Sequence, residues 1–156
     1  MEREFSYFEL SNICNLYELW AEGKIDTDTM SSNLLNAYIR FDGILDIPPV
    51  WDMFLKCNKE LLMDEEEIEG YRSLPNKVKL YRGQATELLN GISWTTDIEV
   101  ARKFANFCRY DEVGILEVEV DKADIICYTN GRNEQECICF ATDEAEWVET
   151  WSKSKV

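Results

Sequence analysis

A chain of 156 residues is long enough for one domain, or for a small domain with a helical extension. Its hydrophobic content of 46% and aromatic content of 12% supply the material of a packed core, which excludes wholesale disorder. There are 31 acidic and 16 basic residues, a formal charge of −15. This charge disfavours a nucleic-acid partner, because binding to phosphates relies on cations.

The chain contains no histidine. Ser-His-Asp and Cys-His catalysis and histidine-ligated zinc are therefore excluded, so catalysis would depend on carboxylates, hydroxyls, thiols, lysine, arginine or a cofactor. The six cysteines form no C-x-x-C pair, and no metal site is expected. Without a signal-peptide pattern or a long apolar run, we expect reduced thiols, a cytoplasmic location and no membrane partner.

Residues 1–75 have the apolar spacing of helices. Two stretches repeat apolar residues at helical intervals, and Pro48 and Pro49 suit the start of a third helix. The predicted apolar stripes are Tyr7, Leu10, Cys14 and Tyr17; Met30, Leu34, Ala37 and Phe41; and Trp51, Phe54, Leu55, Leu61 and Leu62. We therefore predict a helical N-terminal region over residues 1–75.

After Pro75 the pattern changes to short strands, predicted around residues 78–80 and at 92–95, 115–120, 125–128 and 136–140. One helix interrupts them. The tract Thr96-Asp97-Ile98-Glu99 matches the S/T-x-x-E capping box, which predicts Thr96 as the N-cap residue of that helix. Helices followed by mixed strands indicate an α+β fold, with a small mixed β core over residues 76–156.

Three fragments of this half contain residues suited to chemistry. Leu80-Tyr81-Arg82-Gly83 places an arginine at the end of a strand. Ser93-Trp94-Thr95 places two hydroxyls on one strand face and an indole on the other. Glu134-Gln135-Glu136 places two carboxylates on one face where an apolar strand begins. Taken alone, each has an ordinary reading as a surface, core or solvated residue.

Together, and in this order, the fragments resemble the ADP-ribosyltransferase family of the arginine–serine–glutamate class. The resemblance covers about residues 78–140 and includes the strand-to-helix tract from Trp94 to Ala105. It implies an ADP-ribosyltransferase-like catalytic core over residues 76–156. The implied activity is NAD-dependent mono-ADP-ribosyl transfer to a protein, with arginine as the expected acceptor side chain. A phage or bacterial effector acting in the cytoplasm of the producing or host cell fits this family.

The resemblance makes Glu136 the central catalytic residue. Breaking the nicotinamide–ribose bond of NAD passes through an oxocarbenium-like transition state, and the nicotinamide leaves as a neutral base without a general acid. A fixed carboxylate can hold the ribose hydroxyls and stabilise the developing positive charge, which is the role expected of Glu136. Arg82, followed by Gly83, is expected to bind the ribose or the diphosphate through its fork of donors.

The remaining roles are also those that the resemblance implies. Ser93 is expected to hydrogen-bond Glu136, and Trp94 and Thr95 to complete the contacts with NAD. Glu134 and Tyr128 are expected to contact the acceptor. Phe104, Phe107 and Tyr110 are candidates for stacking on nicotinamide, with a core role favoured for Phe104. The nearby cations could balance a diphosphate: Lys77, Lys79, Arg102, Lys103 and Arg132.

Two alternatives remain open. The same pocket could hydrolyse NAD, with water replacing the acceptor, as a NAD glycohydrolase. From a different class, the chain could be a catalytically silent acidic binding or inhibitor protein on the same fold, which occupies a basic surface of its partner.

Overall fold

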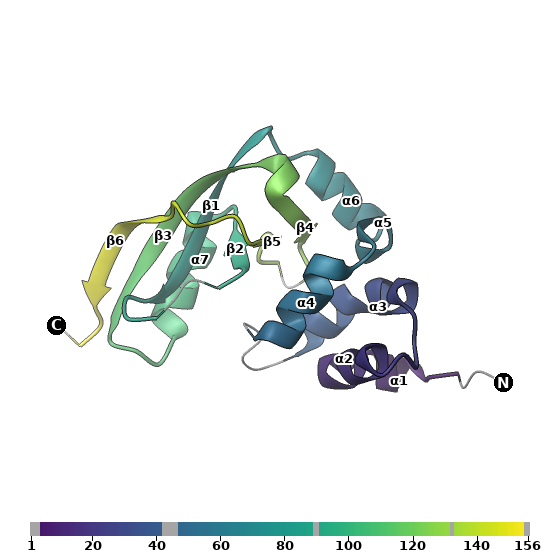
Figure 1. The fold of residues 1–156 in the computed structure, drawn as a ribbon. Coiled ribbons are helices and arrows are strands. Elements are labelled where there is room, and N and C mark those ends of the chain that lie inside the picture. The colour runs from purple at the N-terminus through teal and green to yellow at the C-terminus, as the bar shows by residue number, and fades with distance from the viewer. Residues whose placement is uncertain (1–3, 42–46, 89–90, 132, 155–156) are drawn as a thin grey trace. The chain divides into compact units, whose positions relative to one another are not determined.

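The computed structural model describes residues 4–41, 47–88, 91–131 and 133–154. These residues form seven α-helices, one short 3-10 helix and a six-stranded antiparallel sheet, so the predicted α+β class is confirmed. The chain divides into two compact units, Met1–Glu66 and Glu67–Val156 (Figure 1). The sequence had placed this boundary further along, between residues 75 and 76. None of the described helices combines the length and apolar content needed to cross a membrane.

Polar side chains cap the starts of several helices of the N-terminal unit. Ser6, Asn12 and Asp26 each accept a hydrogen bond from the backbone N–H three residues later, which satisfies a donor that the first helical turn leaves unpaired. The helices are α1 (Tyr7–Leu10), α2 (Ile13–Ala21), α3 (Thr27–Arg40), α4 (Pro48–Lys56) and α5 (Lys59–Leu62); α6 (Glu65–Arg72) begins in this unit and ends in the next.

Two of the three predicted apolar stripes need correction. Along α3, Met30, Leu34 and Ala37 are buried as predicted. The first stripe was wrong because Asn12 starts a new helix, which turns Ile13 and Leu16 into the core and leaves Cys14 exposed. The predicted third helix is split at residues 57–58 into α4 and α5, so Leu55 and Leu61 are exposed and only Phe54 and Leu62 of their group are fully buried.

The sheet lies within the C-terminal unit and has the strand order β4-β5-β2-β1-β3-β6. Its strands are β1 (Lys77–Ala85), β2 (Ser93–Thr95), β3 (Glu112–Asp121), β4 (Ile125–Thr129), β5 (Glu136–Cys139) and β6 (Glu146–Ser152), and the 3-10 helix η1 (Lys122–Asp124) joins β3 to β4. The sequence did not predict β6. This strand pairs only with β3, lies at the edge of the sheet and is largely exposed, so it lacks the apolar run of a buried strand.

The two halves of the sheet meet at one residue pair. β1 pairs with β3 along its whole length, from Lys77 opposite Asp121 to Ala85 opposite Val113. Between β1 and β2, by contrast, the register contains only Tyr81 opposite Thr95. The strands β4, β5 and β2 therefore form one three-stranded group, and β1, β3 and β6 form another. The three sequence fragments singled out above lie where these groups join.

Apolar side chains fill one face of the sheet. This core cluster contains Val78, Leu80, Trp94, Leu116, Val118, Val120, Ile125, Cys137 and Cys139. The alternation of Cys137 and Cys139 on one strand face is confirmed, since both are buried in the cluster.

The helix α7 (Ile98–Phe107) packs against β1 and β3 (Figure 1). It approaches very closely at Gly83, where an added Cβ atom would overlap the Ala101 carbonyl oxygen and lie 2.8 Å from the Ala105 nitrogen. The helix backbone therefore occupies the space that any other residue at position 83 would need. Gly83 is therefore a packing residue, a role that the sequence did not predict, and its role in binding NAD stays a prediction.

The substitution Gly83→Ala should lower the free energy of unfolding by about 2–3 kcal/mol, because the added methyl group forces α7 away from β1. Urea denaturation measures this change. Gly23→Ala is the matched control: a Cβ atom there meets nothing within 4 Å, but φ is +71°, so only a backbone cost of about 1 kcal/mol is expected. Equal losses for the two variants would contradict the close contact with α7.

Burial in the core cluster raises the pKa of the Cys137 thiol from 9.0 to about 12. The folded state therefore holds this proton more tightly than the unfolded state, and the corresponding stability is fully present below about pH 9 and lost as the pH rises toward 12. The free energy of unfolding of Cys137→Ala should fall less steeply than that of the wild type over this range. The control Cys14→Ala, at an exposed cysteine, should keep the wild-type slope. An unchanged slope in Cys137→Ala would contradict the assignment.

Candidate functional site

The pairing of β2 with β5 brings Ser93 to Glu136. Thr95 lies directly opposite Glu136, and Ser93 lies opposite Ile138, so all four side chains share one face and Ser93 is the diagonal neighbour of Glu136. The Ser93 hydroxyl donates a hydrogen bond of 2.5 Å to Glu136 Oε2. Glu136 is only 5% exposed, and a buried carboxylate requires such donors. The hydroxyl therefore holds this carboxylate in place.

Arg82 reaches the same serine from β1. Its Nη1 donates to the Ser93 carbonyl oxygen at 2.7 Å, and its Nε donates to Gln84 Oε1 at 2.8 Å. The guanidinium group thus fastens the end of β1 to β2 beyond their single paired position. Arg82, Ser93 and Glu136, which are far apart in sequence, are joined in one series of hydrogen bonds.

Gln84 is a part of this site that sequence reasoning missed. It is 5% exposed, and its amide nitrogen donates to the Leu88 carbonyl oxygen at 2.9 Å while its oxygen accepts from Arg82. The available signal was alternation, since residues 82 and 84 lie on the same face of a strand. Gln84 orients the guanidinium group from the protein side.

Glu134 was predicted to share a strand face with Glu136, but it does not. β5 begins only at Glu136, and the preceding Asn133 and Gln135 have left-handed backbone conformations, with φ of 59° and 46°. The regular alternation of a strand therefore does not extend back to Glu134. Its position is set instead by Thr95, whose hydroxyl donates to the Glu134 carbonyl oxygen at 2.7 Å.

Asp97, not Thr96, is the N-cap residue of α7. Asp97 accepts a hydrogen bond from the Glu99 backbone N–H, which completes the cap one residue later than the capping box predicts. The Thr96 hydroxyl is thereby free of the helix and donates to Gln135 Oε1 at 3.0 Å. Gln135 had no predicted role, yet it connects the residues before β5 to the turn between β2 and α7.

Two predicted binding residues lie on the opposite face of the sheet. Trp94 is 2% exposed within the core cluster, and its indole nitrogen donates to the Gly91 carbonyl oxygen at 3.0 Å. Tyr128 lies opposite Cys137 in the register of β4 and β5 and packs against the same cluster, and burial raises the pKa of its hydroxyl. The burial of Trp94 contradicts its predicted contact with NAD, whereas Tyr128 is half-buried and its contact with the acceptor stays a prediction.

The predicted cations are largely committed to carboxylates of the protein. Lys77 is paired with Asp121, and Arg102 donates to Glu99 and to both oxygens of Glu149. Lys79 lies 3.7 Å from Glu117, Lys103 is exposed, and Arg132 lies outside the described residues. Lys77, Lys79 and Arg102 are therefore already paired with carboxylates of the protein and are less available to a diphosphate.

The aromatic residues of α7 are at the surface. Phe104 is 45% exposed and Phe107 is 84% exposed, while Tyr110 beyond the helix is 40% exposed. The favoured core role of Phe104 was therefore wrong. The small residues Ala101 and Ala105 face β1 instead, because Gly83 allows the helix backbone to approach so closely.

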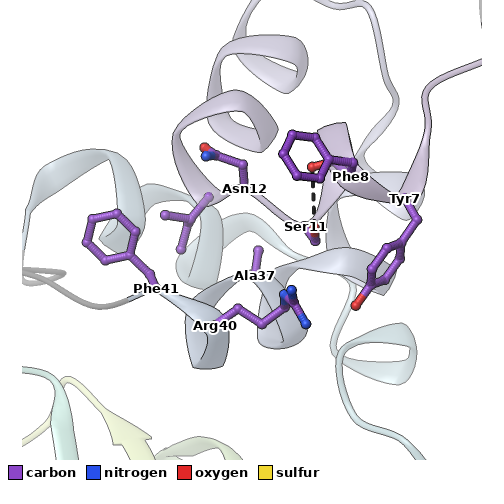
Figure 2. A pocket seen from close by; sticks show the side chains of 8 residues that line it. Tyr7, Phe8, Ser11, Asn12, Ala37, Arg40 and Phe41 are labelled. Atoms are coloured by element: carbon purple, nitrogen blue, oxygen red, sulfur yellow. Dashed lines mark hydrogen bonds between the residues drawn. The ribbon is translucent and has the colours of Figure 1, made fainter.

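Three cavities lie in the N-terminal unit, with volumes of about 190, 140 and 420 Å³. Figure 2 shows the first, which is lined by residues of α1, of the junction between α1 and α2, and of the end of α3. Arg40 lines this cavity, with its guanidinium carbon 5.7 Å from the centre of the Tyr7 ring. None of the residues predicted to bind NAD or the acceptor lines these three cavities.

No family model matches the chain, and neither a curated protein nor a solved structure matches it. Among the residues that the structure describes, no group of three or more cysteine, aspartate or glutamate side chains is placed to hold a metal ion. The hydrogen-bonded residues themselves are therefore the features from which a function can be inferred.

Replacing Arg82 by lysine should lower the free energy of unfolding by about 2 kcal/mol, because one ammonium group cannot reproduce the two directed bonds to Gln84 and Ser93. Urea denaturation provides the measurement. Arg72→Lys, at an exposed arginine in the last turn of α6, is the matched control and should be nearly neutral. If both variants are equally stable, Arg82 does not fasten β1 to β2.

Proposed function

We propose that the C-terminal unit is a NAD-dependent mono-ADP-ribosyltransferase that modifies a guanidinium group of a protein acceptor. The ADP-ribosyltransferase type of β core is part of the same proposal. The observation that carries it is the series Arg82–Ser93–Glu136, in which the Ser93 hydroxyl bonds to a buried carboxylate and the Ser93 carbonyl oxygen accepts a bond from a guanidinium group.

The carboxylate of Glu136 suits the chemistry of the nicotinamide–ribose bond. As this bond breaks, positive charge develops at C1′ of the ribose, and a preorganised anion stabilises that charge more than it stabilises the ground state. The Ser93 hydroxyl fixes the carboxylate, and the low exposure of Glu136 limits screening by water. Glu136 is thus the group expected to accelerate the cleavage.

The transfer step needs no reactant other than NAD and the acceptor. The bond between C1′ and the nicotinamide nitrogen breaks, and its electron pair leaves with neutral nicotinamide. A nitrogen of the acceptor guanidinium then forms a bond to C1′ and loses one proton, which the carboxylate of Glu134 accepts. In the corresponding hydrolysis, water forms the new bond to C1′ and releases its proton to the solvent.

Arg82 can attract the phosphates of such a substrate by its positive charge, although two of its N–H donors are already bound to protein atoms. Its Nε and Nη1 atoms are bound to Gln84 and Ser93, so its position is fixed before the substrate arrives. A fixed positive charge beside Ser93 attracts a diphosphate, although the guanidinium group cannot direct its full set of donors to the phosphates. We therefore expect this site to bind NAD more weakly than a site whose arginine directs all its donors to the substrate.

A second function is favoured by the same two observations. Glu136 is 5% exposed and Arg82 bonds to protein atoms, which is also the pattern of residues retained to hold β1, β2 and β5 together. With a net charge of −15, such a chain would act as a catalytically silent binding or inhibitor protein on a basic surface. Calorimetry decides between the two: the silent protein takes up no NAD at millimolar concentration.

Glu136→Gln should lower the rate of nicotinamide release from NAD about 10²–10³-fold. The amide keeps the volume and can still accept the bond from Ser93, so the fold is preserved while the negative charge is lost. Nicotinamide released over time is the quantity to measure, with and without a protein acceptor. Glu119→Gln, an exposed glutamate of β3, is the control and should keep the wild-type rate. Equal rates for Glu136→Gln and the wild type would remove Glu136 from catalysis.

A further inference from the structure

The residue between the two glutamates is held in a strained conformation. Gln135 has φ of 46°, in the left-handed region that residues other than glycine, asparagine and aspartate seldom adopt. Such a conformation costs on the order of 1–3 kcal/mol and persists only where the surroundings fix it. The contacts that fix Gln135 therefore indicate what this segment is built to hold.

Three hydrogen bonds to Gln135 come from two other segments. Its backbone N–H donates to Asn130 Oδ1 at 3.0 Å, its carbonyl oxygen accepts from the Thr96 N–H at 3.3 Å, and its side-chain oxygen accepts from the Thr96 hydroxyl at 3.0 Å. Beside them, the Thr95 hydroxyl donates to the Glu134 carbonyl oxygen at 2.7 Å. Both residues before Glu136 are thus tied to the turn between β2 and α7.

We propose that Thr96 and Gln135 form a clamp that positions Glu134 and thereby decides whether ADP-ribose passes to a guanidinium acceptor or to water. Thr96 and Gln135 are positioning residues, since they act through Glu134 and touch neither substrate. The inference rests on the proposed function and adds to it the determinant of acceptor choice. Thr95 precedes Thr96 and lies on the same strand, β2, as Ser93, so the acceptor side and the ribose side share one support.

The clamp matters because transfer and hydrolysis share their first bond cleavage. In transfer, an acceptor nitrogen must reach C1′ and give its proton to the Glu134 carboxylate before water attacks. The bonds of the clamp fix the backbone from which the Glu134 side chain projects. A carboxylate on a fixed backbone orients the guanidinium group by paired hydrogen bonds more effectively than one on a mobile backbone. Loosening the clamp should therefore lower the fraction transferred without requiring any change in Glu136.

The test measures this fraction with NAD and the small guanidine agmatine. In Thr96→Val the hydroxyl bond to Gln135 is lost while the shape of the side chain is kept, and the ratio of ADP-ribosyl-agmatine to nicotinamide should fall about fivefold, the effect of one hydrogen bond. Gln135→Leu removes the other partner and should give the same ratio. The double variant should be no worse than either single variant, because all three lack the same bond.

Two controls separate the clamp from a general effect of the substitution. Thr96→Ser keeps a hydroxyl and should restore the wild-type ratio. Thr86→Val makes the same change at a threonine whose hydroxyl makes only a 3.5 Å contact with the Glu112 carbonyl oxygen, and it should leave the ratio unchanged. If Thr96→Val and Thr86→Val give equal ratios, or if the wild type releases nicotinamide but transfers nothing to agmatine, the inference is overturned.

Hydrogen exchange tests the clamp without any turnover. Amide exchange over residues 130–135 should be about fivefold faster in Thr96→Val than in the wild type, while exchange within α7 stays the same and shows that the variant is folded. Unchanged exchange over these residues would contradict the existence of the clamp. A wild type that releases no nicotinamide would remove the proposed function, and the exchange result alone would then decide whether the clamp exists.

Discussion

The hydrogen bond between Ser93 and Glu136 exists because β2 and β5 pair in one register. In that register Thr95 lies opposite Glu136 and Trp94 lies opposite Cys137. Because side chains alternate along a strand, a slip of one residue would turn Glu136 into the apolar core cluster and bring Cys137 out of it. The burial of Trp94 and Cys137 therefore selects the same register that places a serine hydroxyl beside the carboxylate.

Arg82 has an observed structural role and, in the proposed function, a chemical one as well. β1 and β2 share a single paired position, so the join between the two halves of the sheet needs further contacts. Arg82 supplies them through the Ser93 carbonyl oxygen and Gln84. The same bonds fix a positive charge beside the serine that holds Glu136. A transferase and a silent binding protein would share this arrangement, and they differ in whether NAD makes use of it.

Local signals in the sequence predicted the general organisation and failed where tertiary contacts decide. The buried stripe of α3 and the alternation of Cys137 and Cys139 follow from periodicity alone. Asp97 caps α7 instead of the predicted Thr96, because the Thr96 hydroxyl is bonded to Gln135, which is distant in sequence. The pattern E-x-E predicted a strand face for Glu134, but the left-handed Gln135 ends the regular alternation.

The sequence was a better guide to which residues form the candidate site than to how those residues are arranged. The resemblance predicted that Arg82, Ser93 and Glu136 surround one substrate. The structure joins the Ser93 side chain to Glu136 and the Ser93 main chain to Arg82. Gln84 and the link between Thr96 and Gln135 depend on side chains that meet across strands and turns, which spacing along one strand does not reveal. The close approach of α7, which makes Gly83 a packing residue, is likewise a property of the folded unit.

The most direct test of this account is an NMR titration of the chain with NAD, in which the backbone amide shifts are followed residue by residue. Saturable shifts are expected to centre on residues 82–84, 93–96 and 134–136, which supply the guanidinium group, the hydroxyl and the carboxylate of the proposed site. Shifts confined to other parts of the chain, or none at millimolar NAD, would contradict it.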